Sequence, residues 1–65
     1  MKYIVIAHIF EYASGIELHI SGKVVRKYSK RGHNKCLEDL NMITKILNEF
    51  QYEVQASHTI VKPKR

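Results

Sequence analysis

One amphipathic helical pattern stands out in the chain, and it runs from Lys35 to Gln51 with the sequence KCLEDLNMITKILNEFQ. At about 100° per residue, six of its apolar side chains fall within a stripe roughly 120° wide, and Glu38, Asn41, Lys45, Asn48 and Glu49 fall opposite. The stripe consists of Cys36, Leu40, Ile43, Ile46, Leu47 and Phe50. A helix of this kind must bury its stripe against another element.

The start of this helix is predicted at Asn34. Its side-chain oxygen can accept a hydrogen bond from a backbone N–H group that the first turn leaves unpaired. Glu38 and Asp39 would then lie in the first turn and complement the positive end of the helix dipole. Leu37 and Met42 fall off the stripe, and we expect them at its margins or facing a partner.

Three stretches with strand character precede the helix. Residues 3–10, YIVIAHIF, are rich in β-branched and aromatic side chains and apolar on both faces, which is typical of a strand covered on both sides. Residues 16–20 alternate, with Ile16, Leu18 and Ile20 on one face. A Ser21-Gly22 turn is predicted to lead into the third strand, residues 23–28, although a single long bent strand also fits this pattern.

A fourth strand is predicted after the helix, over residues 52–61, until Pro63 removes a ladder donor. The order β-β-β-α-β predicts an α+β fold, a small two-layer sandwich in which an antiparallel β-sheet packs on one amphipathic helix. The 65 residues form one domain with a basic tail at 62–65. One helix covers only one face of the first strand, so we expect a homodimer to cover the other.

Length and cysteine content bound the class of protein. A chain of 65 residues buries only about 60% of its unfolded surface, so its stability is expected to be marginal. Its single cysteine, Cys36, excludes an internal disulfide and makes oligomerisation the expected compensation. The sequence shows neither a secretory signal pattern nor a membrane span, which predicts a cytoplasmic protein with Cys36 reduced and no membrane partner.

Positive charge is concentrated in one segment. Six cations and no carboxylate lie within residues 23–35, whereas residues 1–22 carry a net charge of −1 and residues 36–61 a net charge of −3. A surface of one sign attracts polyanions. Basic loops also serve simply as solvated surface that keeps a small domain soluble, and this alternative stays open.

This basic segment is the candidate binding site, for nucleic acid or another partner. Arginine and lysine supply phosphate contacts, Gly32 allows close backbone approach, and Tyr28 is a possible stacking platform or a strand-packing residue. No helix-turn-helix, zinc-finger or RNA-recognition motif is present, so recognition is expected to depend on the nucleic-acid backbone. The predicted site residues are Lys23, Arg26, Lys27, Tyr28, Lys30, Arg31, His33 and Lys35.

Histidine and cysteine spacing predicts neither a metal nor another cofactor. His8, His19, His33 and His58 are isolated and lack a paired ligand spacing. His8 and His58 occupy apolar alternation positions and could meet inside the sheet, although structural histidines are expected there. Cys36 near a helix start has the setting of a thiol with a lowered pKa, but it also falls on the buried stripe, which favours core packing.

Two function classes follow. The first is a non-enzymatic nucleic-acid-binding module, a compact regulator of the kind found in bacterial or phage genomes. The second is a protein-binding inhibitor or antitoxin-like factor whose positive surface occludes an acidic surface of a target. An enzyme is not expected, because no convergent polar set indicates a pocket. A metal-independent ribonuclease using His33 and a nearby lysine is the remaining enzymatic alternative.

Overall fold

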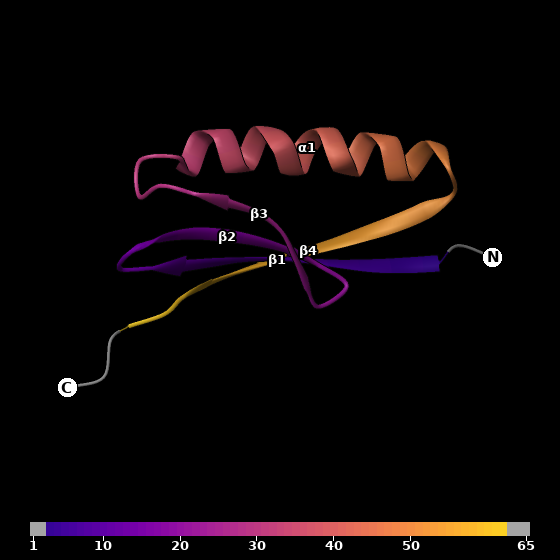
Figure 1. Cartoon of the computed structure of the whole chain (residues 1–65). Coiled ribbons are helices and arrows are strands. Elements are labelled where there is room, and N and C mark those ends of the chain that lie inside the picture. Colours follow the sequence, from indigo (N-terminus) through magenta and orange to yellow (C-terminus); the bar gives the residue numbers. More distant parts are fainter. Residues whose placement is uncertain (1–2, 63–65) are drawn as a thin grey trace.

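A computed structural model describes residues 3–62 as four strands and one helix. The elements are β1 (Tyr3–Tyr12), β2 (Gly15–Ile20), β3 (Lys23–Tyr28), α1 (His33–Glu49) and β4 (Tyr52–Ile60). The strands form one sheet in the order β3-β2-β1-β4, and α1 lies across one of its faces (Figure 1). This arrangement confirms the predicted α+β fold and its β-β-β-α-β order.

The sheet is mixed, so the prediction of a purely antiparallel sheet is wrong. β2 pairs antiparallel with both β1 and β3, whereas β1 and β4 are parallel. The reason is one of direction. Two hairpins make β1 and β3 run the same way, and the returning helix makes β4 run that way too. Because β2 already has two neighbours, β4 can join the sheet only beside a strand that runs parallel to it.

The Ser21-Gly22 turn agrees with the sequence pattern. Ser21 and Gly22 link β2 to β3 with φ values of 52° and 81°, and a two-residue type I′ turn requires positive φ at both central positions. Gly15 opens β2 where the chain passes close to β3. A Cβ atom at Gly15 would lie 2.6 Å from the carbonyl oxygen of Tyr28, so this position accommodates only glycine.

The core lies between α1 and the face of the sheet that it covers. It consists of Ala7, Ile9, Ile16, Leu18, Cys36 and Leu40, with Ile20, Tyr28, Ile43 and Val54 packed around them. The predicted inward faces of β2 and of the N-terminal half of the helix are therefore confirmed. Cys36 is fully buried.

The helix starts two residues before the predicted position. It begins at His33 with Gly32 as its N-cap, and the N–H of Cys36 donates to the carbonyl oxygen of Gly32 over 2.9 Å. Asn34 lies inside the first turn and no side chain caps the helix, so the predicted Asn34 cap is wrong. Glu38 and Asp39 consequently lie beyond the first turn, so the prediction that they complement the positive end of the helix dipole is wrong. Within residues 3–62, no helix is long and apolar enough to cross a membrane.

The C-terminal half of the helical stripe is more exposed than predicted. Phe50 is 69% exposed and Ile46 is 49% exposed. The pairing of the strands explains this, because β2 reaches only residues 7–12 of β1. Under the second half of α1 the sheet is therefore only two strands wide, too narrow to cover the stripe.

Candidate functional site

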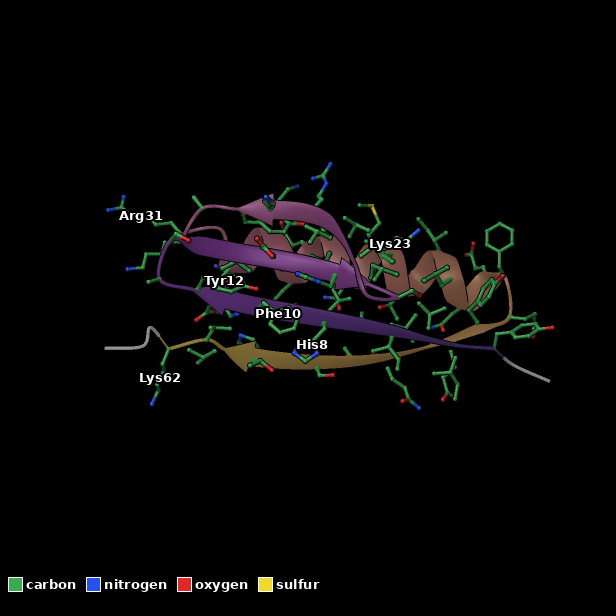
Figure 2. The ribbon with its side chains drawn as sticks, turned by 60° about the horizontal axis from the view of Figure 1, so that its bottom comes forward. His8, Phe10, Tyr12, Lys23, Arg31 and Lys62 are labelled. Carbon is green, nitrogen blue, oxygen red and sulfur yellow. The ribbon has the colours of Figure 1, made fainter. Side chains whose placement is uncertain are left out.

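The face of the sheet opposite α1 carries a row of aromatic side chains. Figure 2 shows His8, Phe10 and Tyr12 in line along β1 on this face. The ring centroids of His8 and Phe10 are 4.2 Å apart with nearly parallel planes, and His19 of β2 approaches Phe10 edge-on at 4.6 Å. We call these four residues, each half-buried, the aromatic row.

The spacing within the aromatic row is uneven. Phe10 stacks on His8 on one side, whereas on its other side the ring of Tyr12 is 6.2 Å away at an interplanar angle of 24°. Stacked bases are spaced by about 3.4 Å, so a base between two rings requires roughly 6.8 Å. The centroid distance between Phe10 and Tyr12 is therefore about 0.6 Å short of that spacing.

Hydrogen bonds hold the two histidines of the row in place. Nε2 of His8 lies 2.7 Å from Oγ1 of Thr59 on β4, and Nε2 of His19 lies 3.0 Å from a carboxylate oxygen of Glu17. His8 and His58 do not meet, because their side chains lie on opposite faces of the sheet. His58 pairs with Ile9 and, like Ile9, lies on the face that the helix covers. The suggestion that these two histidines meet inside the sheet is wrong.

Positive charge borders the aromatic row on the β3 side. β3 is an edge strand, and Lys23 and Lys27 on it are exposed, as are Lys30 and Arg31 in the loop that follows. Lys23 and Arg31 lie on one side of the row and Lys62 on the other (Figure 2). No ion pair joins these four β3-side cations to a carboxylate within residues 3–62. We call Lys23, Lys27, Lys30 and Arg31 the basic edge.

A shallow hollow connects the row to this edge. It has a volume of about 200 Å³ and is lined in part by Tyr12, Glu17 and Lys27. Glu17 lies opposite Lys27 in the strand register, and a carboxylate oxygen of Glu17 lies 3.0 Å from Nε2 of His19. Tyr12 of the aromatic row and Lys27 of the basic edge therefore line the same hollow.

Three of the predicted site residues instead surround one buried carboxylate. Asp39 is 5% exposed, accepts a 2.6 Å hydrogen bond from the Tyr28 hydroxyl, and lies 3.2 Å from the guanidinium of Arg26 and 3.8 Å from the ammonium of Lys35. Tyr28 also packs against the core. The strand-packing interpretation of Tyr28 is thus confirmed, and its hydroxyl is bonded to Asp39.

This network shifts the pKa of its members. The hydrogen bond from Tyr28, with the charges of Lys35 and Arg26, holds the pKa of Asp39 below its usual range. Burial, with the hydrogen bond to Asp39, raises the pKa of Tyr28 to about 12. Burial also raises the pKa of the Cys36 thiol, so the favoured interpretation of Cys36 as a core residue is confirmed over that of a thiol with a lowered pKa.

Replacing Asp39 with asparagine is expected to destabilise the domain at neutral pH. A carboxyl group with a lowered folded-state pKa stabilises the protein above its unfolded pKa, near 3.9, and this contribution is lost as the pH falls through the folded value. The difference in Tm between wild type and Asp39→Asn should therefore persist from pH 7 to 5 and shrink below pH 4. Circular dichroism melts measure it, and the exposed neighbour Glu38→Gln is the control. A gap that widens in acid would contradict the assignment.

His33, the last predicted site residue, lies away from the aromatic row. As the first residue of α1 it lies on the helix side of the sheet, where its Nε2 is 3.9 Å from a carboxylate oxygen of Glu11. The structure therefore divides the predicted site into a basic edge, a buried network around Asp39, and His33. Of the basic tail, Lys62 is exposed, and Lys64 and Arg65 lie outside the described residues.

The comparisons with known proteins add no functional information. No protein-family model, curated protein or solved structure matches the chain. The site must therefore be interpreted from its own geometry. Sequence reasoning did not identify the aromatic row, although the alternation over residues 3–10 already placed His8 and Phe10 on one face of the strand.

Proposed function

We propose that this domain binds single-stranded nucleic acid, RNA or DNA, across the uncovered face of its sheet and along the basic edge. The observation that supports this most is the aromatic row on a face that no described element covers. Aromatic side chains on a sheet surface stack with unpaired bases, and each stacked base contributes about 1–3 kcal/mol. A base inserted between Phe10 and Tyr12 would continue the stack that His8 and Phe10 begin.

The basic edge supplies the contacts to the phosphate backbone. Its four side chains are exposed and unpaired within the described residues, so their positive field is available to a ligand. Four phosphate contacts on a single strand correspond to a log–log salt slope of about −3. Arg26 and Lys35 contribute less, because both share the carboxylate of Asp39.

A single strand fits this surface better than a duplex. Duplex DNA is read most often by a helix in the major groove, and α1 lies on the opposite side of the sheet from the aromatic row. Stacking also requires unpaired bases with exposed faces. The proposed interface therefore consists of strand surface and loop.

The test is a fluorescence anisotropy titration with labelled 12-nucleotide RNA, DNA and duplex DNA over a salt series. We expect tighter binding to the single strands and a slope of about −3. Phe10→Ala and Tyr12→Ala should each weaken binding about tenfold through lost stacking. Leu37→Ala is the matched control, because Leu37 is also apolar and is exposed on the helix side.

Two outcomes would overturn the proposal. If Phe10→Ala and Leu37→Ala bind equally well, the sheet face is not the interface. If neither RNA nor DNA binds at 50 mM salt, the second candidate becomes the better one, namely an inhibitor whose basic edge docks on an acidic protein surface. The single, buried Cys36 fits a cytoplasmic location for either candidate, and this location remains part of the proposal.

We further propose that a second copy of the chain covers the opposite end of the uncovered face. Residues 3–5 of β1 pair with β4 but have no strand on the β2 side, and Ile4 in this segment and the neighbouring Ile6 are 57% and 55% exposed. A free strand edge beside apolar side chains is a template for pairing with another chain. Light scattering at high micromolar concentration should give twice 7.6 kDa, and Ile6→Lys should give the monomer mass. A monomeric wild type would contradict the homodimer.

A further inference from the structure

Three side chains of the types that bind metal ions lie together beside the start of the helix, and they come from three separate elements. They are Glu11 near the end of β1, His33 at the first position of α1, and His58 near the end of β4. A carboxylate oxygen of Glu11 lies 3.4 Å from Nε2 of His58 and 3.9 Å from Nε2 of His33. One ligand atom from each residue lies within 4.8 Å of the other two.

The strand register explains how these residues converge. His58 pairs with Ile9 in the parallel β1–β4 ladder, and Glu11 follows on the same helix-facing side of β1. The backbone of Glu11 is held there by a 2.8 Å hydrogen bond from the N–H of Val61 to its carbonyl oxygen. Gly32 is the N-cap of α1, and the first residue of the helix, His33, lies next to the side chain of Glu11. The rings of His33 and His58 lie 5.8 Å apart with an interplanar angle of 28°.

We propose that Glu11, His33 and His58 bind one divalent transition-metal ion, with Zn²⁺ as the preferred occupant. Zinc bonds to histidine nitrogen and carboxylate oxygen are about 2.0–2.2 Å long, so tetrahedral ligands lie roughly 3.3–3.5 Å from one another. The separation between Glu11 and His58 already matches this distance, and that between Glu11 and His33 exceeds it by a few tenths of an ångström. The three side chains are one-third to one-half exposed and can make this adjustment.

The ligand set selects the class of metal. Two imidazole nitrogens and one carboxylate suit zinc, copper or nickel, whereas magnesium and calcium take mostly oxygen ligands. Because the three ligands are partly exposed to solvent, a water molecule can take the fourth coordination position of the ion. This inference is independent of the proposed nucleic-acid function, because none of the three ligands belongs to the aromatic row or the basic edge.

Such an ion would have a structural role. It would join β1, β4 and the start of α1, which lie far apart in the sequence. The buried core within residues 3–62 has six apolar residues, which is small. Small domains commonly use a structural metal to compensate for a limited core. Metal that binds only the folded state adds stability in proportion to the logarithm of its concentration over Kd.

The test uses the full chain, freed of metal with EDTA and then titrated with zinc chloride by calorimetry and thermal melting. We expect one Zn²⁺ per chain and, at a hundredfold excess over Kd, a Tm higher by roughly 10–20 °C. Magnesium chloride should give no shift. His58→Ala, His33→Ala and Glu11→Gln should each weaken zinc binding at least tenfold, because each removes one of three ligands. His8→Ala and His19→Ala, which alter histidines outside the cluster, should bind zinc as the wild type does.

Several results would overturn the inference. One is no zinc binding at millimolar concentration, which would leave the cluster as a carboxylate paired with two histidines. Another is an equal loss of zinc binding in His8→Ala and His58→Ala, which would indicate unspecific histidine binding. If His58→Ala fails to fold, His58→Gln removes the imidazole while keeping a polar side chain, and an unchanged zinc affinity in that variant would also overturn it.

Discussion

Reversing the charge of Lys27, Lys30 and Arg31 together, by Lys27→Glu, Lys30→Glu and Arg31→Glu, is expected to lower the affinity for single-stranded RNA about a thousandfold at 0.1 M salt. Each phosphate contact on a single strand contributes about 0.7 to the log–log salt slope, so three lost contacts remove roughly two orders of magnitude. Repulsion by the three new carboxylates accounts for the rest. The variant should also show a slope closer to zero in the same anisotropy titration.

The choice of residues matters because the basic segment is not uniform. Arg26 donates to the buried carboxylate of Asp39, so reversing its charge would place two carboxylates side by side and damage the fold. The other three cations have no such partner within residues 3–62. Lys30→Glu and Arg31→Glu therefore test binding with little effect on stability, whereas Lys27→Glu places a second carboxylate opposite Glu17 in the sheet and is expected to cost some stability. Circular dichroism melts should verify that the triple variant is folded at the temperature of the titration.

The matched control for charge is Lys45→Glu. Lys45 is exposed on α1, on the opposite side of the sheet from the aromatic row, and its substitution changes the net charge by as much as Lys27→Glu does. We expect Lys27→Glu to weaken RNA binding about tenfold or more and Lys45→Glu to change it little. Equal losses in the two single variants would mean that net charge alone attracts the nucleic acid, and the basic edge would no longer be a site.

Replacing Leu18 with alanine is expected to destabilise the domain by about 2–5 kcal/mol. Leu18 is completely buried in the middle of β2 and belongs to the small core under α1. Small domains are marginally stable, with roughly 0.05–0.15 kcal/mol per residue or about 3–10 kcal/mol for 65 residues, so a loss of this size removes a large share of the total stability. Urea denaturation followed by circular dichroism measures the change.

Val24→Ala is the control for Leu18→Ala, since Val24 is also an apolar strand residue but is 45% exposed. We expect it to cost less than 1 kcal/mol. The comparison also tests the register of the sheet. A slip of one residue would turn Leu18 outward and leave its substitution nearly neutral, so a loss below 1 kcal/mol for Leu18→Ala would contradict the described pairing.

Much of the fold could be predicted from local pattern. The alternation of Ile16, Leu18 and Ile20 identified the buried face of β2, and the helical stripe identified Cys36 and Leu40 as core residues. The helix start was missed because the cap is the backbone of Gly32, which has no side chain to signal it. Parallel pairing of β4 was missed as well, although the directions of the two hairpins and the helix already imply it.

The candidate site was predicted less well, because its composition depends on pairing between distant residues. Arg26, Tyr28 and Lys35 appeared in sequence as members of a binding surface, but the packing of α1 on the sheet places Asp39 among them and makes them structural. Phe10 appeared as one more apolar residue of a strand covered on both sides. Only the packing of α1 on the opposite face shows that no element within residues 3–62 covers the side of the sheet on which Phe10 lies.

What the sequence by itself determined is therefore local: the strands and the helix, the inward faces of β2 and α1, and the crowding of cations into residues 23–35. These properties follow from side-chain periodicity and composition over a few residues. The tertiary structure alone decided which face of β1 stays open, which cations Asp39 neutralises, and that Glu11, His33 and His58 converge. Those outcomes depend on which strand lies beside which and on the face that the helix covers, and no short-range periodicity encodes contacts between residues so far apart in the chain.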